Sequence, residues 1–297
     1  MSIEQPIRLR RCAILWCGLF TLAAVSHARA DHLPAVLPVL PGSDHQHENL
    51  ADLDFSGQDL KNVNFTSADL SRSNISMADL RGVMLLFSRI DDALFDGADL
   101  RGVDLDDIAG TGARFRGVNF VGASFEEANV VGWDFEGAVF SNVNFEEAEF
   151  IASSFRGANL AGVLFDDFHA MDCDFSSADF SGADFLSFNS MRSNFSGADF
   201  TGVTSSFGFL GMFLDANFRG TDLSVLDPSV DLNLAGLQGA VYDAATQFPA
   251  GFDPVTAGMV FIPEPATAPL ATFGLLMILL VAGKVLNTAG TPARWSR

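Results

Sequence analysis

The sequence predicts an all-β solenoid whose chain turns a corner every five residues. Three observations carry this prediction: an apolar residue recurs at every fifth position, the frame holds between residues 50 and 200 without an insertion, and distinctive side chains recur after twenty residues. A period of five matches neither the period of about 3.6 of a helix nor the period of about 2 of an ordinary strand. We therefore expect one small unit, repeated and stacked, through the middle of the chain.

Each five-residue unit has the same plan. An apolar residue usually stands at its centre and a small residue usually two positions earlier, Asp or Asn is common one position earlier, and Gly often follows two positions later. The centre and the small residue are expected to point inward, whereas the Asp, Asn and Gly residues serve the corners. The unit Ala-Asp-Leu-Arg-Gly at 78–82 and 98–102 resembles the consensus of the pentapeptide-repeat family, over about half of the chain. The resemblance implies a right-handed, quadrilateral parallel β-helix with four units per coil.

A coil of twenty residues can be checked within the sequence, because centres twenty apart should stack on one face. One such face consists of Phe55, Ile75, Phe95, Phe115, Phe135, Phe155, Phe175 and Phe195. Another face has small centres at Gly110, Ala170 and Ser190, but the residue two positions earlier is then large: Ile108, Phe168 and Phe188. These exchanges conserve the volume of a close-packed layer. The sequence therefore predicts a filled interior without a pocket.

The composition indicates an acidic surface around an apolar interior. The 297 residues include 29 Phe, and the net charge is −20. The first thirty residues carry +3 and the last thirty-five carry +2, so the part between them carries −25, from 10 basic and 35 acidic residues. Such a surface repels nucleic acid and anionic membranes. Its main role is expected to be solvation of a very apolar core.

The first thirty residues are typical of a secretory signal peptide. Arg8, Arg10 and Arg11 precede an apolar stretch at 12–25, and Ala28-Arg29-Ala30 forms a small-x-small cleavage site before Asp31. We expect signal peptidase to cut there; the alternative is a buried N-terminal helix. Residues 31–47 contain repeated proline and predict a linker.

The last thirty-six residues predict a membrane-associated sorting segment with a C-terminal transmembrane helix. Pro263-Glu264-Pro265 precedes an apolar run at 266–283, which is followed by Lys284, Arg294 and Arg297. The run is near the lower length limit of a spanning helix. The order resembles the PEP-CTERM sorting tail of Gram-negative bacteria, which implies a transient inner-membrane anchor, cleavage by an exosortase near the motif, and release to the cell surface or exopolysaccharide. The alternative is an ordinary single-pass anchor.

Four pairs of acidic residues recur at the coil length and are expected to form one stacked stripe. We call this set the acidic stripe: Asp106, Asp107, Glu126, Glu127, Glu146, Glu147, Asp166 and Asp167. Like charges about 5 Å apart repel unless they are screened or bridged, and Ca²⁺ prefers carboxylate oxygens. The stripe predicts at most a weak association with Ca²⁺, the alternative being a solvated face. No other cofactor is expected.

Catalytic chemistry is not indicated anywhere in the chain. A filled shaft with flat outer faces lacks the concave site in which catalytic groups converge. The serines are not accompanied by a motif that joins a nucleophile to a His and an acid. His45 and His47 offer two imidazoles in the linker but no clear third metal ligand, so a solvated linker is the stronger interpretation.

These observations divide the chain and predict its function. The expected parts are a signal peptide at 1–30, a linker at 31–47, the repeat solenoid at 48–205, an irregular coil and cap at 206–261, and the sorting segment at 262–297. Within the cap, 240–254 is expected to close the end of the solenoid, a binding site being the alternative. We expect an exported, non-enzymatic structural or interaction protein of the cell surface or exopolysaccharide matrix.

The expected partners follow from this address. Signal peptidase and exosortase would process the chain, and exopolysaccharide or a surface protein would bind it. No nucleic-acid partner is expected. The alternative function is an acidic DNA mimic that acts on a DNA-binding enzyme such as gyrase. The leader and the Pro-Glu-Pro tail argue against it, because gyrase is cytoplasmic.

Overall fold

The computed structural model describes residues 39–205, 211–227 and 230–263. Backbone contacts divide the chain into one unit that ends at Phe261 and a second that begins at Ile262. The expected signal helix and the apolar run at 266–283 lie outside the described residues. No helix in the described part is long and apolar enough to cross a membrane.

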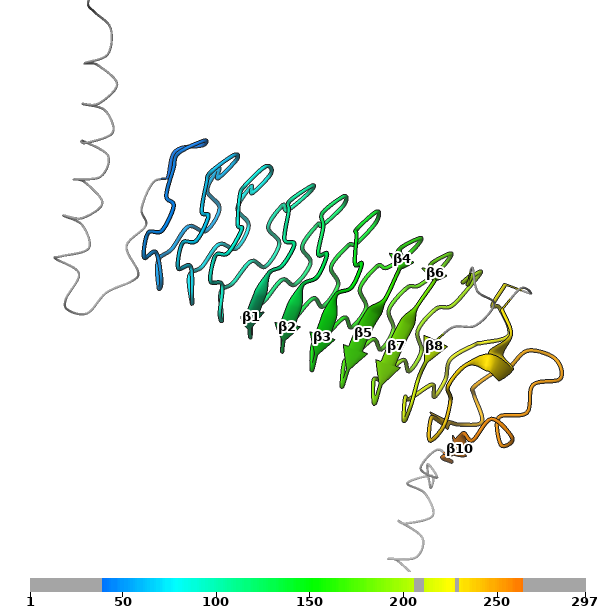
Figure 1. Cartoon of the computed structure of the whole chain (residues 1–297). Helices are drawn as coiled ribbons and strands as arrows, with labels where there is room; N and C mark the ends of the chain where they lie inside the picture. Colours follow the sequence, from blue (N-terminus) through cyan, green and yellow to red (C-terminus); the bar gives the residue numbers. More distant parts are fainter. Residues whose placement is uncertain (1–38, 206–210, 228–229, 264–297) are drawn as a thin grey trace, which may run out of the picture. The chain divides into compact units, whose positions relative to one another are not determined.

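The first unit is an all-β solenoid, whose regular part makes about seven turns. Parallel bridges join residues twenty apart on each of four sides, as in the pairs Asp54 with Asn74, Asp59 with Asp79, Asn64 with Met84 and Asp69 with Arg89. Figure 1 shows the resulting stack of coils. The predicted coil length of twenty residues is confirmed.

Regular strands form mainly on one side of the solenoid. Six of them make a parallel sheet in the order β1 (Ala109–Thr111), β2 (Asn129–Val131), β3 (Glu149–Ile151), β5 (Phe168–Met171), β7 (Phe188–Met191) and β8 (Gly211–Met212). Two shorter pairs are β4 (Leu164–Phe165) with β6 (Asp184–Phe185), and β9 (Val241–Tyr242) with β10 (Val260–Phe261). A 3₁₀ helix, η1 (Leu232–Leu234), lies in the last part of the unit.

The corners explain why Asp, Asn and Gly recur in the sequence. In many units the Asp or Asn before the centre accepts a hydrogen bond from the backbone N–H at the corner, as Asp54 does from Ser56 at 3.0 Å and Asn64 from Thr66 at 3.0 Å. The second corner residue adopts a left-handed conformation, with φ of 67° at Gly57. Glycine adopts this conformation without steric cost, and Asp and Asn tolerate it.

Phenylalanine rings form continuous columns along the interior. Phe135, Phe155 and Phe175 have no exposed surface, and the centroid of the Phe155 ring lies 4.9 Å from that of Phe135 and 4.8 Å from that of Phe175. All three rings are stacked nearly parallel. The inward orientation predicted for this face is confirmed.

The predicted exchange of large and small residues also occurs, and it keeps a ring column unbroken. Phe168 and Phe188 are fully buried beside the small centres Ala170 and Ser190. The Phe168 centroid lies 5.5 Å from that of Phe150, a centre of the preceding coil, and 5.1 Å from that of Phe188. Phe188 in turn stacks on Phe213 at 5.6 Å. The ring changes position within its unit while the column continues.

Trp133 fills interior space that the five-residue pattern does not assign to it. The side chain is 1% exposed, and its Cζ2 atom lies 3.5 Å from the position that a Cβ atom at Gly110 would take. The centroid of Trp133 lies 5.0 Å from that of Phe115. Ile108 therefore shares with Trp133 the compensation for the missing side chain at Gly110. The sequence signal for this contact is a tryptophan two positions before a centre, where most other units have a small residue.

The ordered coils extend beyond both expected boundaries. Asp44 forms a parallel bridge with Asn64, and the His45 N–H donates to the Asn64 carbonyl at 2.9 Å. Residues 39–47 therefore belong to the first coil, and the expectation of a linker up to residue 47 is wrong for them. The cause is the Asx turn at Asp44, which repeats the corner chemistry of later units.

After residue 205 the solenoid continues with longer coils. Asn194 bonds to Asn217, which is twenty-three residues away, and Met212 pairs with Gly236. The expected closing segment at 240–254 contains β9, and the ring of Tyr242 lies against those of Phe248 and Phe261, with centroid distances of 5.4 Å in both cases. The frame is lost in the sequence because these coils vary in length, although stacking persists.

Candidate functional site

The acidic stripe lies along one corner of four successive coils. The N–H of Asp107 donates to the Glu126 carbonyl at 2.9 Å, and the N–H of Glu127 donates to the Glu146 carbonyl at 2.9 Å. The N–H of Glu147 continues the series to the Asp166 carbonyl at 3.1 Å. The second residue of each pair has a left-handed conformation, with φ between 48° and 55°. The structure therefore brings the eight predicted residues into one stack.

The carboxylates of this stripe do not converge on one point. Asp106 accepts a hydrogen bond from the Glu126 N–H at 2.9 Å, and Glu126 accepts one from the Asn144 side chain at 3.1 Å. In the part of the chain that the structure describes, no group of three or more His, Cys, Asp or Glu residues could hold a metal ion. The stripe is a line of separate charges along a corner.

A ladder of ion pairs on another side was not anticipated. Lys61, Arg81 and Arg101 each stand two residues after an Asp and reach back to it, at 3.0 Å for Asp59, 2.7 Å for Asp79 and 2.6 Å for Asp99. Lys61 and Arg81 also approach the Asp of the next coil, at 3.5 Å and 3.6 Å. The repeated Asp-Leu-Arg-Gly sequence was the available signal.

These pairs shift the titration of their members. The hydrogen bond from Arg81 is the main cause that holds the pKa of Asp79 well below its usual range, and Arg101 acts in the same way on the pKa of Asp99. The same contacts raise the pKa of both arginines. Since the basic side chains are almost half exposed, solvent keeps each pair a modest contributor to stability.

His45 and Cys173 have structural surroundings. The Nδ1 atom of His45 lies 3.0 Å from a Glu48 carboxylate oxygen, the Nε2 atom lies 2.9 Å from the Ser43 hydroxyl, and the ring stacks on Phe65. Cys173 is buried, and burial raises the pKa of its thiol to about 12. A thiol of this kind stays protonated and unreactive at neutral pH.

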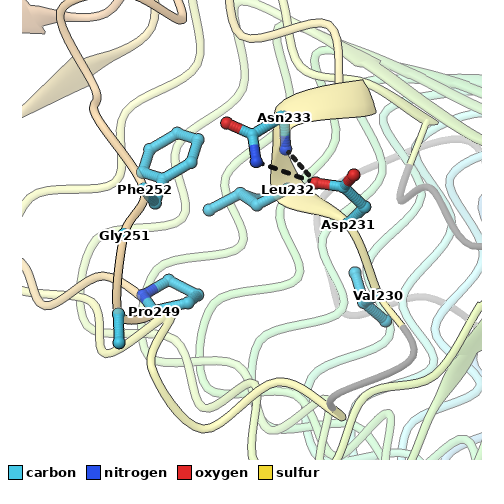
Figure 2. Close-up of a pocket in the computed structure, with 8 residues that line it drawn as sticks. Val230, Asp231, Leu232, Asn233, Pro249, Gly251 and Phe252 are labelled. Carbon is cyan, nitrogen blue, oxygen red and sulfur yellow. Dashed lines mark hydrogen bonds between the residues drawn. The ribbon is translucent and has the colours of Figure 1, made fainter.

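A shallow cavity of about 390 Å³ lies near the C-terminal end of the solenoid. Figure 2 shows Asp231 and Asn233 on one wall and Pro249 and Phe252 on the other. The Asp231 carboxylate already accepts hydrogen bonds from the backbone N–H of Asn233 at 3.0 Å and from its side-chain amide at 2.9 Å. This carboxylate therefore caps η1, and the walls bring together no pair of a nucleophile and a base.

The predicted processing sites lie almost entirely outside the described residues. Ala28, Ala30 and Asp31 precede the described residues, and Glu264 and Pro265 follow them. Of the sorting motif, the structure describes Pro263 alone.

Comparison with known proteins agrees with the geometry of the coils. The family model for pentapeptide repeats matches this chain in eight copies, at residues 49–85, 93–132, 134–167 and 173–204. The chain belongs to the pentapeptide-repeat family. Its repeats account for the centres, small residues and corners described above. No curated protein matches the chain.

Solved structures of other pentapeptide-repeat proteins resemble this one at low sequence identity. HetL, a protein involved in heterocyst differentiation regulation in the cyanobacterium Nostoc sp. strain PCC 7120, is 18% identical, with 83% of this chain and 93% of that chain covered and a TM-score of 0.28. A trypsin-treated form of QnrB1, a plasmid-mediated fluoroquinolone resistance protein, is 16% identical, with 78% and 98% covered and a TM-score of 0.33. These identities and scores carry no functional argument.

Proposed function

We propose that this pentapeptide-repeat protein is an exported, non-enzymatic structural or interaction protein of the cell surface or exopolysaccharide matrix. The observation that carries the non-enzymatic part is the filled shaft, because rings such as Phe135 and Phe155 have no exposed surface. A filled shaft leaves only its outer faces for contact with other molecules. We expect the solenoid to be right-handed, as the family resemblance implies.

The proposed cellular location depends on the two ends of the sequence. The basic and apolar leader with Ala28-Arg29-Ala30 supports cleavage by signal peptidase before Asp31. Pro263-Glu264-Pro265, with the apolar run and basic residues after it, supports a transient inner-membrane anchor and processing by an exosortase. The acidic surface supports a partner other than nucleic acid, such as exopolysaccharide or a surface protein.

The sorting motif provides a direct test. We expect Glu264→Gln to accumulate in the inner-membrane fraction and to disappear from the released fraction, as measured by cell fractionation and immunoblotting. Glu136→Gln is the matched control, because Glu136 is an exposed corner residue of the solenoid. This control should be released like the unaltered protein.

Three other results would change the proposal. Normal release of Glu264→Gln would show that Glu264 is not needed for release, and retention of the unaltered protein in the inner membrane would favour an ordinary single-pass anchor. Recovery of the unaltered protein from the cytoplasm would favour the DNA-mimic function, for which the stacked acidic stripe would supply the charge.

A further inference from the structure

One outward position is apolar in five successive coils. Val131, Ile151, Met171 and Met191 pair in register in the six-stranded sheet, and the Arg192 N–H bonds to the Leu214 carbonyl, which places Leu214 next in the series. We call these five residues the apolar ladder. Val131 is 38% exposed, and the other four are partly exposed. The ladder faces water in the single chain.

The corresponding position in other coils is more polar. In the coils before Val131 it holds Ala51, Ser71, Asp91 and Thr111, and at the corner of the acidic stripe it holds carboxylates. Single apolar residues on a surface are normal, but a contiguous set is typical of an interaction site. Four residues of the ladder are the last residues of β2, β3, β5 and β7 in the longest sheet, and Leu214 follows β8 by two residues. Figure 1 shows these strands side by side. The ladder therefore has a regular and rigid support.

The charges beside the ladder identify its occupant. Asp172 and Arg192 directly follow Met171 and Met191, form an ion pair at 2.6 Å, and leave 46% and 48% of their side chains exposed. Consider two copies side by side and antiparallel, with the twofold axis at a level midway between Met171 and Met191. Asp172 then faces Arg192 of the second copy, and Arg192 faces Asp172 of the second copy. The surface is complementary to itself, as a twofold interface requires.

We propose that the apolar ladder is the contact between two copies of this chain, packed side by side in antiparallel orientation. Met171 packs on Met191 of the second copy, and Ile151 packs on Leu214 of the second copy. The flexible methionine side chains fit such a surface because they adapt to irregular gaps. The opposite charges at positions 172 and 192 fix the orientation and register.

The size of the ladder sets the strength of this contact. Five coils at about 4.8 Å per step extend about 19 Å. A standard stable interface buries about 800 Å² of surface on each partner, and a strip of this length buries less. We expect a weak, reversible dimer with a Kd on the order of 100 μM.

Sedimentation equilibrium of the purified full chain, from about 5 to about 500 μM, tests the apolar part of the contact. Ile151→Lys should weaken association at least about tenfold. Val121→Lys is the matched control, because Val121 is a partly exposed residue at the equivalent position of a different corner. A monomer throughout this range, or an equal loss in the control, would overturn the proposal.

Charge reversal tests the partner and the register. Asp172→Arg alone and Arg192→Asp alone should each prevent self-association, because like charges then face each other. An equimolar mixture of the two variants should associate again. Neither variant keeps the ion pair within one chain, so recovery in the mixture can come only from contacts between chains. Both substitutions suit the left-handed corner, where Arg72 and Asp52 have φ of 57° and 62°. A mixture that stays monomeric would contradict the register.

Discussion

Phe155→Asp should lower the free energy of unfolding by at least about 4 kcal/mol. Phe155 has no exposed surface and lies between the rings of Phe135 and Phe175 at 4.9 Å and 4.8 Å. A carboxylate at this place would be buried without a partner and would leave part of the ring volume empty. Urea and thermal unfolding of the full chain, followed by circular dichroism, measure the loss.

The same substitution at the surface is the control. Phe87 is 69% exposed and occupies a left-handed corner position with φ of 57°. Asp tolerates that conformation better than a bulky ring does, so Phe87→Asp should change stability by no more than about 0.5 kcal/mol. An unchanged melting temperature for Phe155→Asp would show that the inward frame is wrong.

Phe188→Ala should cost about 3–5 kcal/mol, because its ring bridges the Phe168 and Phe213 rings and the neighbouring centre, Ser190, is small. Ser190→Phe alone should cost about 1–3 kcal/mol through overpacking. The double variant Phe188→Ala with Ser190→Phe should be more stable than Phe188→Ala alone. It recreates the arrangement of Ala148 and Phe150 in an earlier coil, where both side chains are fully buried.

A double-mutant cycle on unfolding free energies measures this compensation. We expect a favourable coupling of about 2 kcal/mol or more between the two substitutions. Phe95→Ala combined with Ser190→Phe is the control, because these positions are several coils apart and their effects should add. Additive losses in the Phe188 and Ser190 cycle would contradict the exchange of volume within a layer.

The sequence was sufficient for the regular coils because each unit repeats its own packing and corner chemistry. The position that Phe155 occupies points inward in every coil of its face, so a period of five residues predicts that this side chain is buried. The recurrence of acidic pairs after twenty residues predicted their stacking, which the bond from Glu127 N–H to the Glu146 carbonyl shows. Local pattern and coil register coincide in such a fold.

Features that depend on single exceptions were not predictable in the same way. Trp133 fills the space at Gly110 from the next coil, and a pattern within one unit does not reveal that contact. Longer coils after residue 205 shift the frame, so the stacking of Asn194 on Asn217 is hidden from a fixed period. The turn at Asp44 looked like part of a proline-rich linker because it follows Pro38 and Pro41.

The candidate sites show a different limit. The sequence predicted that the acidic stripe is negatively charged and that its residues stack along one corner. The distances between its carboxylates, however, depend on the directions of the side chains. The repeat pattern does not predict the apolar ladder, because Val131, Ile151 and Met171 stand at corner positions, where the pattern sets no rule for side-chain polarity. Its register became visible only when paired strands placed these residues side by side.

Mass spectrometry of the protein recovered from the cell surface and the culture medium tests the central claim most directly. The proposed export and processing predict a mature chain that begins at Asp31 and ends near Pro263-Glu264-Pro265. Intact mass and terminal peptides together define both ends. A mature pool that retains Met1 and continues to Arg297, with none of the processed chain outside the cell, would contradict the account.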